Sequence, residues 1–125
     1  MKWLGRRMMT LPLYLGLCQN ERKFRTELKR LGVKEEVPFI SPGGNATTHF
    51  FECRDRTSAI VCIPADHKAS LIQAHAMLCH EAVHVWQEAR AIIGEHKPSA
   101  EFEAYSIQAI AQELMVAYRH PAKKR

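Results

Sequence analysis

The chain has 125 residues, of which 46% are hydrophobic and 25% charged, and its formal net charge is +5 at pH 7. This composition excludes disordered and fibrous proteins, and the length predicts a single domain, residues 1–125, with one modest core. The basic excess lies in Lys2, Arg6 and Arg7 and at positions 123–125, without an interleaved stripe of aromatic residues. These charges therefore do not predict nucleic-acid binding.

The cysteines and the N-terminal segment bear on the cellular compartment. The four cysteines form no Cys-x-x-Cys pair and are too scattered for a secreted disulfide scaffold. Residues 1–18 combine basic and apolar stretches, as a secretory signal does, but Pro12 and Tyr14 interrupt the apolar run and no A-x-A-like cleavage site follows. The sequence contains no run of about 18 apolar residues, so we expect no membrane-spanning helix. We therefore expect a cytoplasmic protein without membrane partners.

Hydrophobic periodicity and turn residues predict an α+β fold. A first amphipathic helix covers 19–31 and is closed by Gly32, and a loop rich in Pro and Gly follows over 38–44. Two β-branched and aromatic runs, at 47–53 and 58–63, predict a hairpin. Two helices complete the chain: a long, largely buried one over 68–94, and one over 100–118 with Ser99 as its N-cap.

The strongest chemical signal is the segment HEAVH at 80–84, within the long helix. Each helical residue advances about 100°, so His80 and His84 lie about 40° apart on one face and can share one metal ion. Glu81 lies too far round to be a comfortable ligand, but it can act as general base on a zinc-bound water that attacks a peptide carbonyl. The metzincin pattern is excluded, because Gln87 and Arg90 stand where it requires Gly and His.

A catalytic zinc site needs a third protein ligand. The last helix offers Glu101, Glu103 and Glu113. Glu101 and Glu103 are about 200° apart on that helix, so only one of these two can face the histidines. The residues alone leave the choice open, and they also leave open other groups such as His96.

The segments HEAVH (80–84) and EFEAY (101–105) together resemble the gluzincin pattern, HExxH followed by ExxAD or ExxAN. That pattern occurs in thermolysin-like, heat-shock membrane and small repressor-cleaving peptidases. The resemblance spans about residues 71–114, and the same segments look like those of short phage and prophage proteins. It implies a minimal zincin-like fold, a Zn²⁺ ion, and Glu101 as the third ligand. Tyr105 stands where the pattern has Asp or Asn, so the carboxylate or amide that usually supports a ligand histidine is replaced.

These features predict a zinc metalloendopeptidase-like hydrolase that acts on a polypeptide substrate, with Glu81 catalytic and His80, His84 and Glu101 holding the metal. Tyr105 and Tyr118 are candidates for stabilising an oxyanion. The alternative hypothesis is a non-catalytic interaction or assembly module of a phage or prophage, in which zinc is structural.

The remaining polar residues near the motif receive other interpretations. We expect His75 to be a packing residue and Cys79 to be a small buried hydrophobe. Glu88 is expected off the ligand face, in solvent or paired with Arg90 or a neighbour. His49 lies in a predicted strand, and zincin-type peptidases pair an edge strand with extended substrate, so a binding role is open to it.

Overall fold

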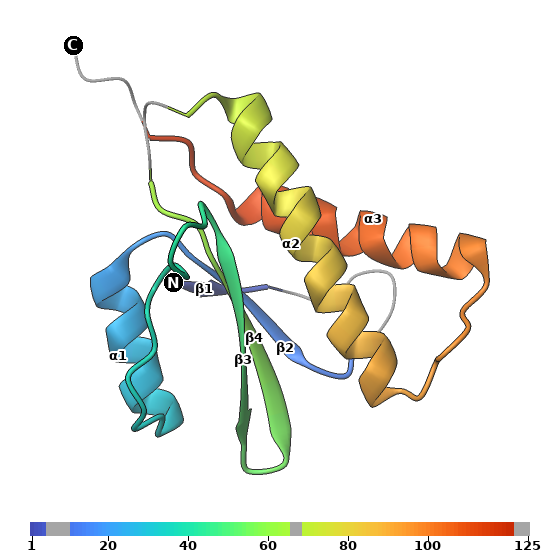
Figure 1. Ribbon diagram of the computed structural model, residues 1–125, viewed down its shortest axis with the longest axis horizontal. Helices are drawn as coiled ribbons and strands as arrows, with labels where there is room; N and C mark the ends of the chain where they lie inside the picture. The colour runs from blue at the N-terminus through green and yellow to red at the C-terminus, as the bar shows by residue number, and fades with distance from the viewer. Residues whose placement is uncertain (5–10, 66–68, 122–125) are drawn as a thin grey trace.

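The computed structural model describes residues 1–4, 11–65 and 69–121. The elements follow one another as β1 (Lys2–Trp3), β2 (Tyr14–Cys18), α1 (Glu21–Leu31), β3 (Thr47–Cys53), β4 (Arg56–Cys62), α2 (Leu71–Ile92) and α3 (Ala100–Ala117) (Figure 1). The predicted α+β fold is confirmed, with its order of N-terminal helix, hairpin, long helix and C-terminal helix. The basic residues Arg6 and Arg7 and positions 123–125 lie outside the described residues.

The strands form a mixed sheet in the order β1-β2-β4-β3. β2 is parallel to β4, whereas β1 is antiparallel to β2 and β3 is antiparallel to β4. β2 was not predicted, because its apolar run was interpreted only as part of a signal-like N-terminus. In the structure this run is an interior strand, and β3 lies at an edge of the sheet.

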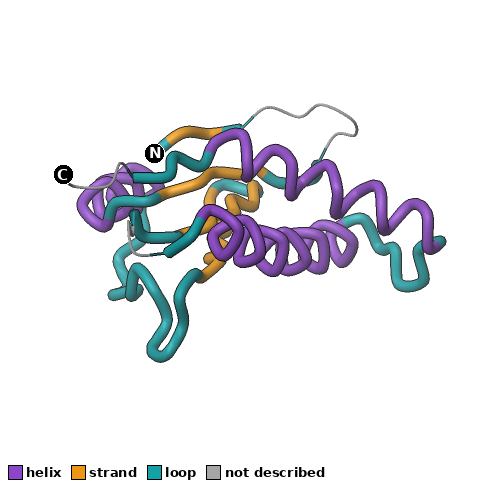
Figure 2. Tube along the Cα trace, turned by 90° about the horizontal axis from the view of Figure 1, so that it is seen from above, coloured by secondary structure: helices purple, strands orange, loops and turns teal. Residues whose placement is uncertain are grey.

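Both faces of the sheet are covered by helices. α1 lies on one side and α2 and α3 lie on the other (Figure 1), where the two long helices are neighbours (Figure 2). Side chains alternate accordingly: Leu15, Leu17, Ala59, Val61 and Ile63 pack toward α2 and α3, while Cys18, Ile60 and Cys62 pack toward α1. A strand buried on both faces has few polar positions, which explains the near-continuous apolar runs of β2 and β4.

The β3–β4 hairpin closes through a tight two-residue turn at Arg54 and Asp55, whose φ angles are 53° and 61°. Positive φ at both central residues is the conformation of a type I′ turn, which matches the twist of a hairpin. Cys53 pairs directly with Arg56, so β4 begins two residues earlier than the predicted start at Ser58. The predicted hairpin itself is confirmed.

Local sequence signals set the helix ends. Asn20 and Ser99 cap α1 and α3 through their side chains, and Gly32 closes α1 with a φ of 78°. Ser70 and Gln73 form a reciprocal capping box that starts α2 at Leu71, later than the predicted position 68, which lies outside the described residues. None of the helices in the described part of the chain is long and apolar enough to cross a membrane.

α2 buries a single stripe, which corrects the expectation of a largely buried helix. The buried residues are Ala74, Leu78, Glu81, Ala82, Val85, Trp86 and Ala89. Their spacing of three and four residues keeps them on one side of the helix. The adjoining side, which carries His80 and His84, is exposed. This orientation places the histidines at a pocket wall and not in the core.

Candidate metal centre

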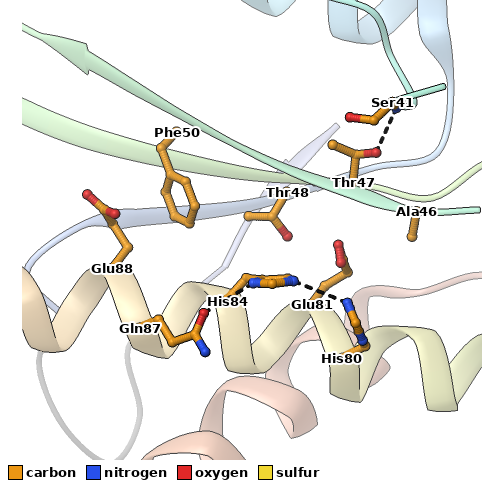
Figure 3. Close-up of a pocket in the computed structure, with 10 residues that line it drawn as sticks. All are labelled: Ser41, Ala46, Thr47, Thr48, Phe50, His80, Glu81, His84, Gln87 and Glu88. Carbon is orange, nitrogen blue, oxygen red and sulfur yellow. Dashed lines mark hydrogen bonds between the residues drawn. The ribbon is translucent and has the colours of Figure 1, made fainter. Parts of the chain in front are cut away.

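His80, Glu81 and His84 form a compact cluster on α2, as the sequence predicts. Their possible ligand atoms all lie within 4.8 Å of one another, and this is a group that could hold a metal ion. The two Nε2 atoms are 3.1 Å apart, with the rings 72° from parallel (Figure 3). Zinc–nitrogen bonds of about 2.0–2.1 Å at a tetrahedral angle place two ligand nitrogens about 3.3 Å apart. The imidazoles are therefore spaced almost as two ligands of one metal ion would be.

Glu81 occupies the boundary between the core and this cluster. Its residue surface is only 3% exposed. Within the described chain its carboxylate makes no hydrogen bond and no ion pair. The side chain packs against the core, and Glu81 also lines the pocket, where a cation or a bound water can meet its carboxylate. The surroundings of Glu81 therefore fit a metal ion or its water.

Gln87 fixes the orientation of one imidazole, a role that sequence reasoning missed. His84 Nδ1 lies 3.2 Å from Gln87 Oε1. An amide oxygen only accepts hydrogen bonds, so Nδ1 carries the proton and donates it. The lone pair of His84 is then on Nε2, which points at His80. A second hydrogen bond of this kind sets the tautomer of most metal-binding histidines. The i, i+3 spacing from His84 to Gln87 was the available signal.

The cluster opens into a pocket of about 410 Å³ between α2 and β3. Its wall on the strand side includes Thr47, Thr48 and Phe50 (Figure 3). The Thr48 hydroxyl is buried, has no hydrogen-bond partner among the described residues, and faces the cluster across the pocket. An orphaned buried hydroxyl is a place where a bound water or ligand is expected. Thr48 is a second residue that the sequence analysis did not single out.

The glutamates of α3 do not join the cluster. Glu103 Oε2 accepts a hydrogen bond of 2.9 Å from Trp86 Nε1, and Phe102 packs edge-on against the same indole. Trp86 is two residues beyond His84 and thus about 200° round the helix from it. The first turn of α3 is therefore held on the side of α2 that faces away from the pocket.

This geometry bears on the expected third ligand. Glu101 is exposed in that first turn and is not among the described groups that could share a metal with the histidines. Glu113 is half-buried further along α3, and His96 is exposed in the loop between the helices. Neither belongs to the cluster. Among the described residues, Glu81 supplies the carboxylate nearest the two imidazoles, and the expectation for Glu101 has no geometric support.

His75, His49 and Cys79 all lie outside the metal cluster. His75 packs against Tyr118, with ring centroids 6.5 Å apart, as a packing residue should. His49 stacks on Phe24 beneath α1, on the face of the sheet opposite the pocket, so it is not placed for the binding role left open to it. Cys79 is exposed, which corrects the expectation that it is buried.

The two candidate tyrosines lie outside the pocket, whereas Glu88 lies in its wall. Tyr105 is 57% exposed on α3, and Tyr118 is buried against the other end of α2; neither lines the pocket. Glu88 does line the pocket, contrary to the expectation that it lies in solvent or pairs with Arg90. Arg90 instead donates to the carbonyl oxygen of His96.

The site combines two convergent imidazoles, the carboxylate of Glu81 and an open pocket beside a sheet edge. This set can bind a divalent metal and place a general base next to it. Comparison with known proteins adds no assignment, because no family model, no curated protein and no solved structure matches this chain.

Proposed function

We propose that this protein is a zinc-dependent metallopeptidase, in which His80 and His84 hold the metal and Glu81 is the general base. The observation that carries the proposal is the 3.1 Å approach of the two Nε2 atoms beside the carboxylate of Glu81, which makes no hydrogen bond or ion pair within the described chain and lines the pocket. Two helical histidines are ligands that zinc favours, a carboxylate beside them can act as the base, and the pocket leaves room for a substrate.

Zinc, when bound, supplies a Lewis acid that polarises the substrate carbonyl and makes a coordinated water acidic near neutral pH. Glu81 accepts the proton from the attacking water and returns it to the leaving amine, so one carboxylate serves as base and then as acid. Gln87 keeps the His84 lone pair on Nε2 through its hydrogen bond to Nδ1. The Thr48 hydroxyl, buried and free to donate, offers a hydrogen bond to the reacting oxygen atoms.

An extended polypeptide is the substrate class that suits this pocket. β3 pairs only with β4 among the described strands, so its outer edge is available for backbone hydrogen bonds with an added strand. The pocket continues past Ala46, His80 and Glu81 into a second one of about 390 Å³ beside Met77. Space on both sides of the cluster allows cleavage within a chain, as in an endopeptidase. A cytoplasmic location is part of the proposal, supported by four free cysteines.

The test is zinc content and proteolysis measured on the same preparation. We expect one zinc per chain and cleavage of unfolded, carboxymethylated casein that stops with a chelator and returns with zinc. Glu81→Gln should abolish cleavage while retaining zinc and fold, because the carboxamide cannot accept the proton. Glu95→Gln, at an exposed position beyond α2, is the matched control and should cleave normally.

Failure can take two informative forms. A protein without zinc affinity would refute the proposed centre itself. A protein that keeps zinc but cleaves nothing, in wild-type and control alike, would favour a structural zinc in an interaction module. The pairing of two histidines with no third ligand from α3 is the observation that makes this second candidate worth testing.

A further inference from the structure

Glu88 is a carboxylate in the candidate pocket that the proposed chemistry does not use. It lies one helical turn beyond His84, and it lines the pocket together with Gln87 and Phe50. Figure 3 shows its side chain leaving α2 on the side that faces β3, as the His84 ring does. Glu88 is half-buried in this position. It is therefore available to a molecule bound in the pocket.

No group in the described part of the chain neutralises this carboxylate. Glu88 makes no hydrogen bond or ion pair within the described chain, whose ion pairs are Arg25–Glu21 and Arg30–Glu27 on α1. Arg90, the nearest arginine along α2, is engaged with the His96 carbonyl. Lysine and arginine are absent from the described pocket lining. In a protein of net charge +5, the pocket thus presents an unpaired negative charge.

The aromatic ring of Phe50, in the same pocket as Glu88, indicates which kind of side chain would bind there. Phe50 is half-buried and lies on the strand side of the pocket, opposite α2 (Figure 3). A carboxylate next to an aromatic face suits a Lys or Arg side chain, whose aliphatic stem packs on the ring while its charge meets the carboxylate. A neutral or acidic side chain would leave Glu88 unpaired or repelled.

Distances along α2 indicate how far from the cleaved bond the substrate's Lys or Arg side chain lies. The helix rises about 1.5 Å per residue, so Glu88 lies about 9 Å beyond the midpoint of His80 and His84. An extended chain rises about 3.3 Å per residue, so this offset equals about three residues. If the residue next to the scissile bond were the N-terminal residue of the substrate, its α-amino group would lie too close to the metal to reach Glu88. An internal basic side chain fits better than a chain terminus.

We infer that Glu88 binds a Lys or Arg side chain of the polypeptide substrate and selects a basic residue within about three positions of the cleaved bond. Because Glu88 lies at one end of the pocket, the selection acts on one side of that bond only. The inference rests on the proposed peptidase function, and it names the substrate class for that same site.

A library of peptides cleaved by the zinc-loaded protein tests this selection. In the wild-type we expect Lys and Arg to be enriched at one position within three residues of the cleavage site. Glu88→Gln should lower kcat/KM for a basic peptide by about 10-fold or more relative to its glutamine-substituted counterpart, as loss of a charge-assisted hydrogen bond implies. Glu88→Lys should shift the preference toward acidic residues, and Glu95→Gln should leave it unchanged.

Binding provides a readout that does not require cleavage. In the zinc-loaded Glu81→Gln background, a fluorescent lysine peptide should bind more tightly than its glutamine counterpart, and adding Glu88→Gln should remove the difference. Selective binding without wild-type cleavage would refute the peptidase and retain the Glu88 subsite. Wild-type cleavage without basic enrichment, or with enrichment that survives Glu88→Gln, would overturn the subsite and retain the peptidase.

Discussion

Replacing Glu101 with alanine separates two accounts of the metal site. The gluzincin-like sequence pattern makes Glu101 a zinc ligand, whereas the structure holds the first turn of α3 against Trp86, away from the pocket. If the structural arrangement persists when metal binds, Glu101→Ala leaves zinc affinity unchanged. His84→Ala, by contrast, removes one of the two imidazoles of the cluster and should weaken zinc binding strongly.

We expect His84→Ala and Glu101→Ala to change the zinc Kd by very different factors. Four-ligand zinc sites gain roughly 10–16 kcal/mol on binding, or roughly 2.5–4 kcal/mol per ligand, so His84→Ala should raise the zinc Kd by about 10²–10³-fold. Glu101 is an exposed acidic residue at a helix N-terminus, worth about 0.3–1 kcal/mol of stability through the helix dipole. Its removal should change the zinc Kd by less than about twofold.

Competition with a chromophoric chelator measures both constants, and urea unfolding with a chelator present measures stability. Glu103→Ala is a useful companion, because it removes the acceptor of the Trp86 hydrogen bond and should destabilise the metal-free protein by about 1–3 kcal/mol. A loss of zinc affinity in Glu101→Ala as large as that in His84→Ala would refute the structural reasoning. It would mean that α3 shifts when the metal binds and that the sequence pattern identifies the ligand correctly.

Further substitutions test the surroundings of the site and the core. Thr48→Val should stabilise the metal-free protein to urea by about 1–3 kcal/mol, because it removes a buried hydroxyl without a partner, and it should slow cleavage; destabilisation would show that the hydroxyl is satisfied. Gln87→Leu should weaken zinc binding by about 10–100-fold in a chelator competition, whereas Gln87→Glu should retain it. Burial raises the pKa of the Cys18 and Cys62 thiols, so above about pH 9 the unfolded chain loses these protons first. The free energy of unfolding should then fall by up to about 1.4 kcal/mol per pH unit per thiol, and a slope unaltered in Cys62→Ala would contradict this.

The elements that local signals determine were predictable from the sequence. Ser99 and Gly32 mark helix ends, and the β-branched runs around the Arg54–Asp55 turn mark the hairpin, because capping and turn chemistry act between neighbours in the chain. β2 was missed because a short apolar run looks the same as a signal-like segment until its partner strand is known. Its pairing with β4, more than 40 residues later, depends on a long-range contact that no local pattern records.

In the candidate site, too, the features set by local sequence were predictable, whereas those set by packing between elements were not. The convergence of His80 and His84 follows from helical spacing alone, and the structure reproduces it at 3.1 Å. The third ligand depends on the register and crossing of α2 and α3, which the packing of Trp86 determines. A helical wheel describes each helix separately, so it cannot give that register. Thr48 was equally out of reach, since it meets the cluster only through the placement of an edge strand over α2.

Gln87 changes how the departure at Tyr105 should be interpreted. In the sequence pattern, a carboxylate or amide on α3 orients a ligand histidine, and Tyr105 supplies neither and is exposed. Gln87 performs this orientation from α2 itself, one turn beyond His84, through the hydrogen bond to Nδ1. A site oriented within one helix does not depend on where α3 lies. The absence of an Asp or Asn at position 105 is therefore no argument against metal binding, because the support for His84 comes from its own helix.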